Sequence, residues 1–235
     1  MEPRGPLEVY DAAARARRLT KLFGSTPAVL LADLDVAAGT VCVLVGGNGA
    51  GKTTLLRVLA TAARPTSGSA HVHGLDVVAQ AAAVRQVADF LPASGGLYLD
   101  LTALENLRFC ARMRSLQLSD DKLAEALAQA GLSGVAGERL RTFSSGMLRR
   151  VGLARLIVTR PQVALLDEPY AGLDAAGREL LDSLLREMRE DGRTAILATH
   201  EQERALALAD SVYRLERGIA ELEQPALAGS LGVPA

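Results

Sequence analysis

The chain has 235 residues, of which 49% are hydrophobic and 23% are charged, and its formal net charge is −1. A chain of this length and composition can bury a full hydrophobic core, so we expect one domain. The net charge excludes attraction of the whole protein to nucleic acid or anionic lipid, and we expect no nucleic-acid partner.

The cysteines and the hydropathy indicate the cellular compartment of the chain. Cys42 and Cys110 stand in or beside apolar segments without C-x-x-C spacing. This is typical of core residues in a reducing compartment rather than of a disulfide framework or a zinc site. No run of about 18 apolar residues occurs, and residues 1–5 lack the layout of a signal peptide. We therefore expect a soluble, cytoplasmic chain.

The first forty residues predict a small, strand-rich flap. Short apolar runs at residues 7–10 and 29–36 are separated by Gly24, Pro27 and Gly39. Phe23 stands out because only 3% of the residues are aromatic. Its ring fits two interpretations: it stacks on a nucleotide base, or it belongs to the core.

A phosphate-binding loop is expected after the apolar run VCVLV at residues 41–45. Residues 46–54 match the pattern G-x-x-x-x-G-K-S/T, between that run and a helical pattern. Glycines let the backbone N–H groups surround an anion, so the loop predicts a triphosphate site. Lys52 would reach the β and γ phosphates, Thr53 would offer a hydroxyl to Mg²⁺, and Thr54 would contact a nearer phosphate. The nucleotide-binding candidates in this loop are Gly46, Gly47, Asn48, Gly49, Ala50, Gly51, Lys52, Thr53 and Thr54.

The chain then returns to strands before a helical region begins. A turn at residues 64–68 leads to a strand at residues 70–72, in which His71 and His73 are expected to be half-exposed. Another apolar run at residues 87–91 is followed by a loop at residues 92–96. These two histidines have no third ligand, so no metal site is expected here.

Residues 97–130 have a helical pattern. Thr102 and Glu105 form a capping box for a first helix, while Ser119 opens a second helix that Gly131 can close. Two consecutive helices interrupt the alternation of strands and helices. We therefore expect an inserted helical sub-domain at about residues 97–160, within a single domain of residues 1–235.

The stretch FSSGMLRR at residues 143–150 opens a helix that stops at Pro161. Taken alone, Ser144 is an N-cap. In a chain that also has a phosphate loop, the turn of Ser144, Ser145 and Gly146 at a helix start predicts a second anion site.

A buried strand at residues 163–167 ends in two carboxylates, Asp167 and Glu168. Acidic pairs at the end of a buried strand are costly, which favours a cation or a catalytic task over a helix cap. Asp167 fits the role of holding Mg²⁺, and Glu168 fits a general base for the attacking water. Asp174 is expected to cap a long helix at residues 175–190.

The last part of the chain predicts one more buried strand, at residues 194–198, which delivers His200. Ligands gather at the carboxyl ends of parallel strands, so His200 is expected to face the γ-phosphate. A helix to residue 209 and a strand pair at residues 212–222, turning at Gly218, complete the prediction.

The order of these motifs resembles the nucleotide-binding domain of ATP-binding cassette (ABC) transporters along almost the whole chain. The resemblance implies an α/β fold of the P-loop NTPase class, with a parallel-sheet core, an antiparallel β flap and an inserted helical sub-domain. It also implies ATP and Mg²⁺ as cofactors. The matching positions are Phe23 as the adenine-stacking aromatic, 46–54 as Walker A, 144–147 as the signature loop, Asp167 and Glu168 as Walker B, 171–174 with Asp174 as the D-loop, and His200 as the switch histidine.

The family further implies a head-to-tail dimer, formed by two copies or with a related cassette. Ser144 and Gly146 of one subunit would cap the γ-phosphate that Lys52 of the partner subunit holds. Two positions depart from the family pattern. Ala93 or Ser94 stands where the family usually has a glutamine, and the signature is FSSGM rather than LSGGQ. The first departure puts metal geometry and coupling to the membrane partner in doubt.

The resemblance implies an ATP-hydrolysing subunit that powers export through a separate multi-span membrane subunit, peripheral on the inner face of the cell membrane. The layout is most similar to the haem exporter of cytochrome c maturation, followed by drug or lipid exporters. A soluble assembly ATPase, as in iron–sulfur cluster synthesis, and a non-hydrolysing regulator remain alternatives. The interval between Lys52 and Ser144 has no room for the coiled coil of a chromosome-maintenance ATPase. If 235 residues are the full chain, the length also excludes a ribosome-binding factor with two cassettes in one chain.

Overall fold

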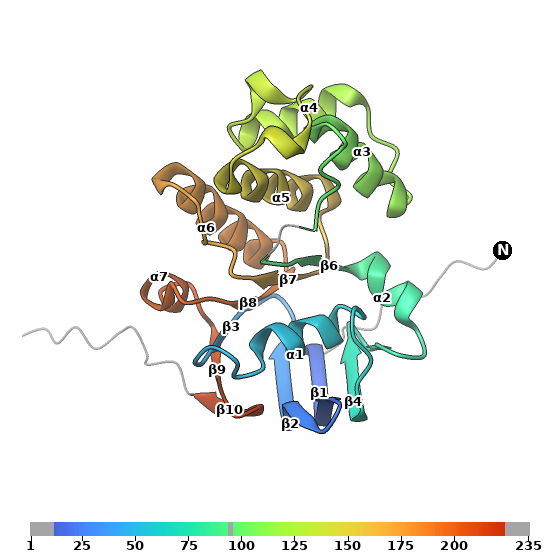
Figure 1. Ribbon diagram of the computed structural model, residues 1–235, viewed down its shortest axis with the longest axis vertical. Coiled ribbons are helices and arrows are strands. Elements are labelled where there is room, and N and C mark those ends of the chain that lie inside the picture. Colours follow the sequence, from blue (N-terminus) through green and yellow to red (C-terminus); the bar gives the residue numbers. More distant parts are fainter. Residues whose placement is uncertain (1–11, 94–95, 224–235) are drawn as a thin grey trace, which may run out of the picture.

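The computed structural model describes residues 12–93 and 96–223, with two β-sheets at one end and a group of helices at the other (Figure 1). The apolar run expected at residues 7–10 and the position Ser94 lie outside the described residues. The strands are β1 (Ala12–Phe23), β2 (Thr26–Ala37), β3 (Val41–Val45), β4 (Ser67–Val72), β5 (Leu75–Asp76), β6 (Ala88–Leu91), β7 (Val163–Asp167), β8 (Thr194–Ala198), β9 (Ser211–Glu216) and β10 (Ile219–Glu223). The α-helices are α1 (Lys52–Leu59), α2 (Ala81–Val87), α3 (Ala103–Met113), α4 (Asp120–Gln129), α5 (Ser145–Thr159), α6 (Ala175–Glu190) and α7 (Gln202–Leu206).

The larger sheet has the strand order β10-β9-β3-β8-β7-β6. Its five strands from β9 to β6 are parallel, and β10 pairs with β9 in the antiparallel direction. Every residue of β3, β7 and β8 is buried, because parallel strands in such a sheet are covered on both faces. The continuous apolar runs of the sequence therefore predicted these three strands correctly.

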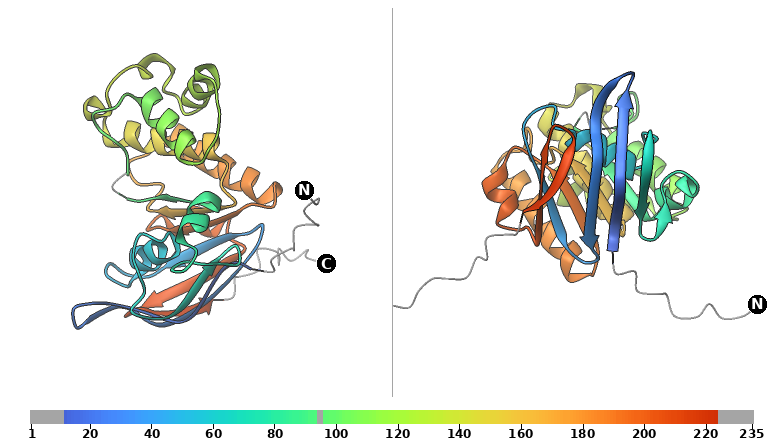
Figure 2. Two further views of the ribbon diagram at one scale, coloured as in Figure 1. Left: turned by 90° about the vertical axis from the view of Figure 1, so that its right-hand side faces the viewer. Right: turned by 90° about the horizontal axis from the view of Figure 1, so that it is seen from below.

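The smaller sheet has the order β2-β1-β4-β5 and is antiparallel throughout, as expected of the flap (Figure 2). Its two first strands are 12 residues long each and form a hairpin, longer than the short runs expected from the sequence. The reason is that the exposed positions of β1 are charged. Arg15 and Arg17 both pair with Asp35 across the hairpin, so the strands extend beyond their apolar residues.

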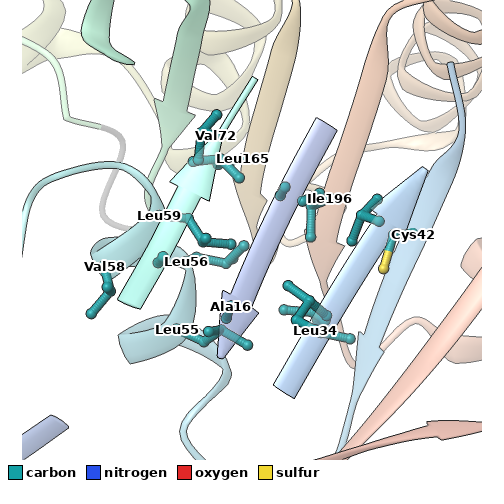
Figure 3. Close-up of a cluster of buried hydrophobic side chains, with 14 of the residues drawn as sticks. Ala16, Leu34, Cys42, Leu55, Leu56, Val58, Leu59, Val72, Leu165 and Ile196 are labelled. Atoms are coloured by element: carbon teal, nitrogen blue, oxygen red, sulfur yellow. The ribbon is translucent and has the colours of Figure 1, made fainter. Parts of the chain in front are cut away.

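Helix α1 lies between the two sheets and carries much of their common core (Figure 3). Its Leu55 and Leu56 are fully buried in one cluster with Ala16 of β1, Leu165 of β7 and Ile196 of β8. Burial of a leucine side chain contributes roughly 1.5–3 kcal/mol. The helix that follows the phosphate loop is thereby fixed against both sheets.

Helices α3, α4 and α5 share a separate hydrophobic cluster that includes Leu107, Leu127 and Val151. The capping box of Thr102 and Glu105 is present at α3, and Ser119 caps α4, as the sequence indicated. In Figure 1 these helices stand apart from the smaller sheet. This cluster lies within residues 97–160, the segment expected to form the helical sub-domain.

A few elements differ from the predictions. Helix α2 has no sequence signal of its own, and α7 ends at Leu206 rather than at residue 209. His73 lies in a turn with a positive φ of 50°, not on a strand. Within the described residues, no helix is long and apolar enough to cross a membrane.

Candidate active site

The candidate functional residues of the core lie together at the carboxyl-terminal ends of strands in the larger sheet. Strands β3, β7 and β8 are parallel neighbours, so their carboxyl ends lie side by side. The phosphate loop follows β3, Glu168 follows β7 directly, and His200 comes two residues after β8. The topology therefore assembles the segments that sequence reasoning had singled out one by one.

The phosphate loop has a backbone that only glycine fits at two positions. Gly46 has a φ of +145°, and a Cβ there would lie 2.2 Å from the carbonyl oxygen of Leu215. Gly51 has a φ of +105°, and a Cβ there would lie 2.2 Å from the carbonyl oxygen of Ala28. Close approach of the loop to β2 and β9 thus requires both glycines.

Lys52 is the first residue of α1 and is 7% exposed. Its ammonium donates hydrogen bonds to the carbonyl oxygens of Gly46, at 2.7 Å, and Gly47, at 3.0 Å. The side chain is therefore curled over the loop that it follows. The amides of the first turn of α1 point to the same place, where an anion is favoured by the helix dipole.

Thr53 and Asp167 form a pair of oxygen donors. The hydroxyl of Thr53 donates a 2.9 Å hydrogen bond to Oδ1 of Asp167, which is 3% exposed. A hydroxyl and a carboxylate side by side suit Mg²⁺, which prefers oxygen ligands and keeps several waters. The part of the chain that the structure describes has no group of three or more His, Cys, Asp or Glu side chains fit for a metal. Mg²⁺ is usually bound through one or two protein oxygens together with substrate phosphates and water.

Glu168 adopts a left-handed backbone with a φ of 49°, uncommon for a residue that is not glycine. Its amide donates to the carbonyl of Ala198 at 2.7 Å. Its carboxylate accepts a hydrogen bond from the backbone amide of His200 at 3.1 Å and lies 3.2 Å from Nε2 of that histidine. The alternative that the acidic pair caps a helix is wrong, because α6 is capped by Asp174.

One open pocket of about 440 Å³, a size typical of small-molecule sites, is lined by Lys52, Thr53, Glu168 and His200. Asp167 is not part of the lining but is hydrogen-bonded to Thr53. Phe23 is at its rim and is 55% exposed, so the alternative of a core phenylalanine is wrong. The ammonium of Lys21 lies 5.0 Å from the centre of its ring. The lining residues are Phe23, Ala28, Asn48, Gly49, Ala50, Gly51, Lys52, Thr53, Thr54, Glu168 and His200.

The second predicted anion site lies elsewhere. Ser144 is the N-cap of α5, its hydroxyl accepting from the amide of Met147 at 3.3 Å. Ser144 and Ser145 are exposed, and among the described residues neither they nor Gly146 line the pocket of Lys52. A Cβ on Gly146 would lie 2.7 Å from the carbonyl oxygen of Gly172, so the two turns are packed together.

Asp174 joins these turns to the helical region. Its carboxylate accepts from the amide of Gly177 at 3.0 Å and pairs with Arg150 of α5 at 2.5 Å. The hydrogen bond from Gly177 and the guanidinium of Arg150 lower the pKa of Asp174. It caps α6 as expected and fixes the start of that helix against α5.

Comparison with known proteins decides the family. The family model described as ABC transporter matches residues 31–171. Over 197 residues the chain is 36% identical to the cytochrome c biogenesis ATP-binding export protein CcmA of Nitrosomonas europaea, covering 84% of this chain and 91% of CcmA. The chain belongs to the ABC transporter family. It is one of the ATP-binding cassettes of that family, and such a cassette is an ATPase domain.

Other relatives of the cassette carry different names. The chain is 36% identical to the daunorubicin/doxorubicin resistance ATP-binding protein DrrA of Streptomyces peucetius, covering 91% of this chain and 66% of DrrA. It is 34% identical to the sulfate/thiosulfate import ATP-binding protein CysA of Thermosynechococcus vestitus, covering 86% of this chain and 61% of CysA. The chain thus spans less than two thirds of the length of CysA.

A solved structure confirms the predicted fold of the cassette. It is a dimeric post-hydrolysis state of the ATP-binding cassette MJ0796 bound to ADP and Pi. The superposition has a TM-score of 0.82 at 24% identity and covers 90% of this chain and 98% of that one. The α/β architecture with a parallel core, flap and helical insertion is therefore the one expected.

Sequence reasoning missed Arg149, a buried neighbour of the cassette's acidic pair. Its guanidinium donates to the carbonyls of Pro92, at 3.0 Å, and Ala93, at 2.7 Å. Burial lowers the pKa of Arg149, and the charges of Asp167 and Glu168 oppose that shift. No sequence pattern separates this arginine from Arg150 beside it, because its partners lie more than fifty positions away.

Proposed function

We propose that this chain is the ATP-hydrolysing subunit of an ABC exporter. The observation that carries the proposal is that one pocket is lined by Lys52, by Thr53, which is bonded to Asp167 behind it, and by the pair of Glu168 and His200. One chain thus provides, at a single sheet edge, a phosphate cradle, oxygen ligands for a cation, and a carboxylate beside a histidine. Hydrolysis of a phosphoanhydride needs these three elements together.

The loop from Gly46 to Thr54 binds the triphosphate in this proposal. When phosphate enters, Lys52 exchanges its two carbonyl partners for phosphate oxygens, since both are acceptors of the same kind. The amides of Gly47, Asn48, Gly49, Ala50 and Gly51 and the hydroxyl of Thr54 surround the remaining oxygens. The exposed ring of Phe23 at the rim provides a platform for the adenine.

Thr53 and Asp167 hold Mg²⁺ through their adjacent oxygens. When bound, the ion neutralises charge that develops on the phosphates during transfer. Asp167 can act in this way because it is fixed at the end of a buried strand, so it does not have to reorganise.

Glu168 acts as the general base in this proposal. Its carboxylate lines the pocket, with Oε2 bonded to the backbone amide of His200 and Oε1 beside Nε2 of that histidine, and in this proposal it accepts a proton from an attacking water. The left-handed backbone of Glu168 aims this side chain toward the pocket rather than into the sheet. In this proposal His200 holds Glu168 through their 3.2 Å contact and faces the γ-phosphate.

A second cassette completes the site. Ser144 and Ser145 are exposed and Gly146 is half-buried at the start of α5, where backbone amides and hydroxyls favour an anion. They would cap the γ-phosphate bound by the other cassette, with Asp174 in the adjoining turn. The partner is a second copy of this chain or a related cassette, and ATP lies at the interface.

The transport role requires a separate multi-span membrane subunit, which would place the cassette on the cytoplasmic face of the cell membrane. The similarity to CcmA along 91% of its length supports export for cytochrome c biogenesis, with haem as cargo. The similarity to DrrA supports a second candidate, export of a drug or lipid. CysA is an import protein by name, so the direction of transport is part of the proposal.

Two experiments test this function. The purified chain should release phosphate from ATP with Mg²⁺, and removal of the metal by EDTA should abolish the release. Tagged chain isolated from detergent-solubilised membranes of its host should bring down a multi-span membrane protein. Recovery with a soluble partner instead would favour an assembly ATPase, and no phosphate release in any preparation would favour a non-hydrolysing regulator.

A further inference from the structure

Asp182 of α6 is a buried carboxylate that is 4% exposed. Its Oδ1 accepts a 2.7 Å hydrogen bond from the hydroxyl of Tyr170, a side chain with no exposed surface. Its Oδ2 accepts a 2.7 Å hydrogen bond from Nε of Arg204 on α7. Arg204 also pairs with Glu179 of α6. Both oxygens of this buried carboxylate are thus satisfied by side chains from two other segments.

The two partners of Asp182 come from the segments that carry Glu168 and His200. Tyr170 is separated from Glu168 by Pro169 alone, so its ring fixes the chain immediately after the base. Arg204 is four residues after His200, and Glu201 beside that histidine pairs with Arg178 of α6 at 2.8 Å. Helix α6 therefore holds the chain just after Glu168 and just after His200.

The hydrogen bonds of Asp182 are better suited to fixing the relative placement of the segments they join than to raising the free energy of unfolding. A buried ion pair recovers little more than its desolvation cost, and a phenol and a carboxylate in a core could be replaced by apolar side chains. Directional hydrogen bonds, in contrast, allow only one relative placement of their segments. Burial and the bond to Asp182 raise the pKa of Tyr170, so the phenol stays a donor at neutral pH.

We propose that Asp182 is a positioning residue, which holds Glu168 and His200 in their hydrolytic arrangement through Tyr170 and Arg204. The proposal rests on the proposed function, because it takes those two residues as the hydrolytic pair. If one anchor is lost, the base and the histidine separate while the phosphate loop on β3 is untouched. Turnover should therefore fall without a loss of ATP affinity.

The sharpest test is Tyr170→Phe in the full chain, which deletes one hydroxyl and keeps the ring in the core. We expect kcat for ATP hydrolysis to fall by about 10- to 100-fold with KM within about twofold, as for a small misplacement of reacting groups. Arg204→Met should give the same result, and Arg204→Lys should restore part of kcat because its ammonium can still reach Asp182.

Arg193→Met is the matched control. Arg193 is also buried and ion-paired to α6, with Asp191 at 2.7 Å and Glu187 at 3.3 Å, but it belongs to the opposite end of that helix. It should lower the unfolding temperature while kcat stays at the wild-type value. An unchanged kcat in Tyr170→Phe, or an equal fall in Arg193→Met, would overturn the positioning role. An inactive wild-type chain would instead overturn the proposed function and this inference with it.

Discussion

The two halves of the proposed ATP site differ in how completely one chain builds them. On the phosphate-loop side, Lys52 and Asp167 are 7% and 3% exposed, and each has hydrogen-bond partners inside the chain. On the signature side, Ser144 and Ser145 are exposed, and the hydroxyl of Ser144 accepts from its own helix. The first half is arranged before any ligand arrives. In the proposed function, the second half is a surface that binds nucleotide only when another cassette faces it.

This difference has a physical origin. A cradle for three phosphates must hold its dipoles in fixed directions, so its backbone is locked against β2 and β9 through Gly46 and Gly51. A capping surface has to form and separate in each cycle, and burial within its own chain would prevent that. Changes on the first side should therefore abolish binding or chemistry in every context, and changes on the second side should act only on the dimer.

The largest effect is expected from Glu168→Gln. The amide cannot accept the proton of the attacking water, so hydrolysis should slow by about 10²–10⁴-fold while ATP binding is retained. Phosphate release and equilibrium ATP binding measure the two properties separately. Glu203→Gln, an exposed acid on α7, is the control and should keep wild-type turnover. Wild-type turnover in Glu168→Gln would show that the base is assigned wrongly.

Lys52→Met should weaken ATP binding on the phosphate-loop side of the site. Loss of the buried ammonium removes the charge beside the phosphates, and turnover should fall by about 10²–10³-fold, with ATP affinity reduced as well. Titration with a fluorescent ATP analogue measures the affinity. The exposed Lys122 of α4 provides the matched change Lys122→Met, which should leave binding intact. Equal affinities in the two variants would contradict the role of the loop.

Ser144→Arg should distinguish the contribution of the signature side from that of the phosphate-loop side. The bulky side chain blocks the signature surface, so turnover should fall by about tenfold or more, whereas ATP binding by the single chain should be unchanged. Ser119→Arg removes the equivalent N-cap of α4 and controls for the lost cap, worth about 1 kcal/mol. If Ser119→Arg slowed turnover as much, the effect of Ser144→Arg would be one of helix stability alone.

A smaller effect is expected from Phe23→Ala. Base stacking contributes about 1–3 kcal/mol, and we expect the lower end because the ring is 55% exposed, which corresponds to a roughly fivefold loss of ATP affinity. Tyr98 is 54% exposed and contacts Phe109 instead of the pocket, so Tyr98→Ala is the matched control. Affinity for ATP that is the same in both variants would remove Phe23 from the site.

The smallest effect is expected on the pH dependence of folding stability, through Asp174, which connects the start of α6 to α5. The pKa of Asp174 is lowered by Gly177 and Arg150, so its contribution to folding is present above the unfolded value of about 4 and is lost as the pH falls through the lower folded value. Asp174→Asn should therefore lower the unfolding temperature at pH 7 and have no effect well below pH 4. Thermal unfolding followed by circular dichroism at both pH values measures this. If the unfolding temperature of Asp174→Asn were also lowered well below pH 4, the loss of stability would not come from the charge of Asp174.

Much of the fold could be predicted because local signals agree with the tertiary structure. The apolar run before Asp167 gives β7, the N-cap Asp174 gives the start of α6, and Pro161 comes right after Arg160, the C-cap of α5. At these three positions, the residues that determine burial or helix capping lie within a few positions of one another in the sequence. The convergence of strand ends could be predicted as well, since parallel neighbours share an edge.

The rest could not be predicted, because it depends on contacts between distant segments. The length of β1 follows from Arg15 and Arg17 pairing with Asp35, which a count of apolar residues misses. Arg149 is an arginine in a basic pair until the fold brings it to Pro92 and Ala93. The network of Asp182 likewise has no local signal.

The most direct test of the whole account is the oligomeric state of Glu168→Gln, by sedimentation velocity with and without Mg²⁺ and ATP. The account predicts a monomer of 24.7 kDa without nucleotide and a dimer with it. The dimer should be absent when Ser144→Arg is added, because two complementary half-sites must meet around the nucleotide. A chain that binds ATP and remains a monomer at high protein concentration would contradict the claim that the signature surface completes the site of a second cassette.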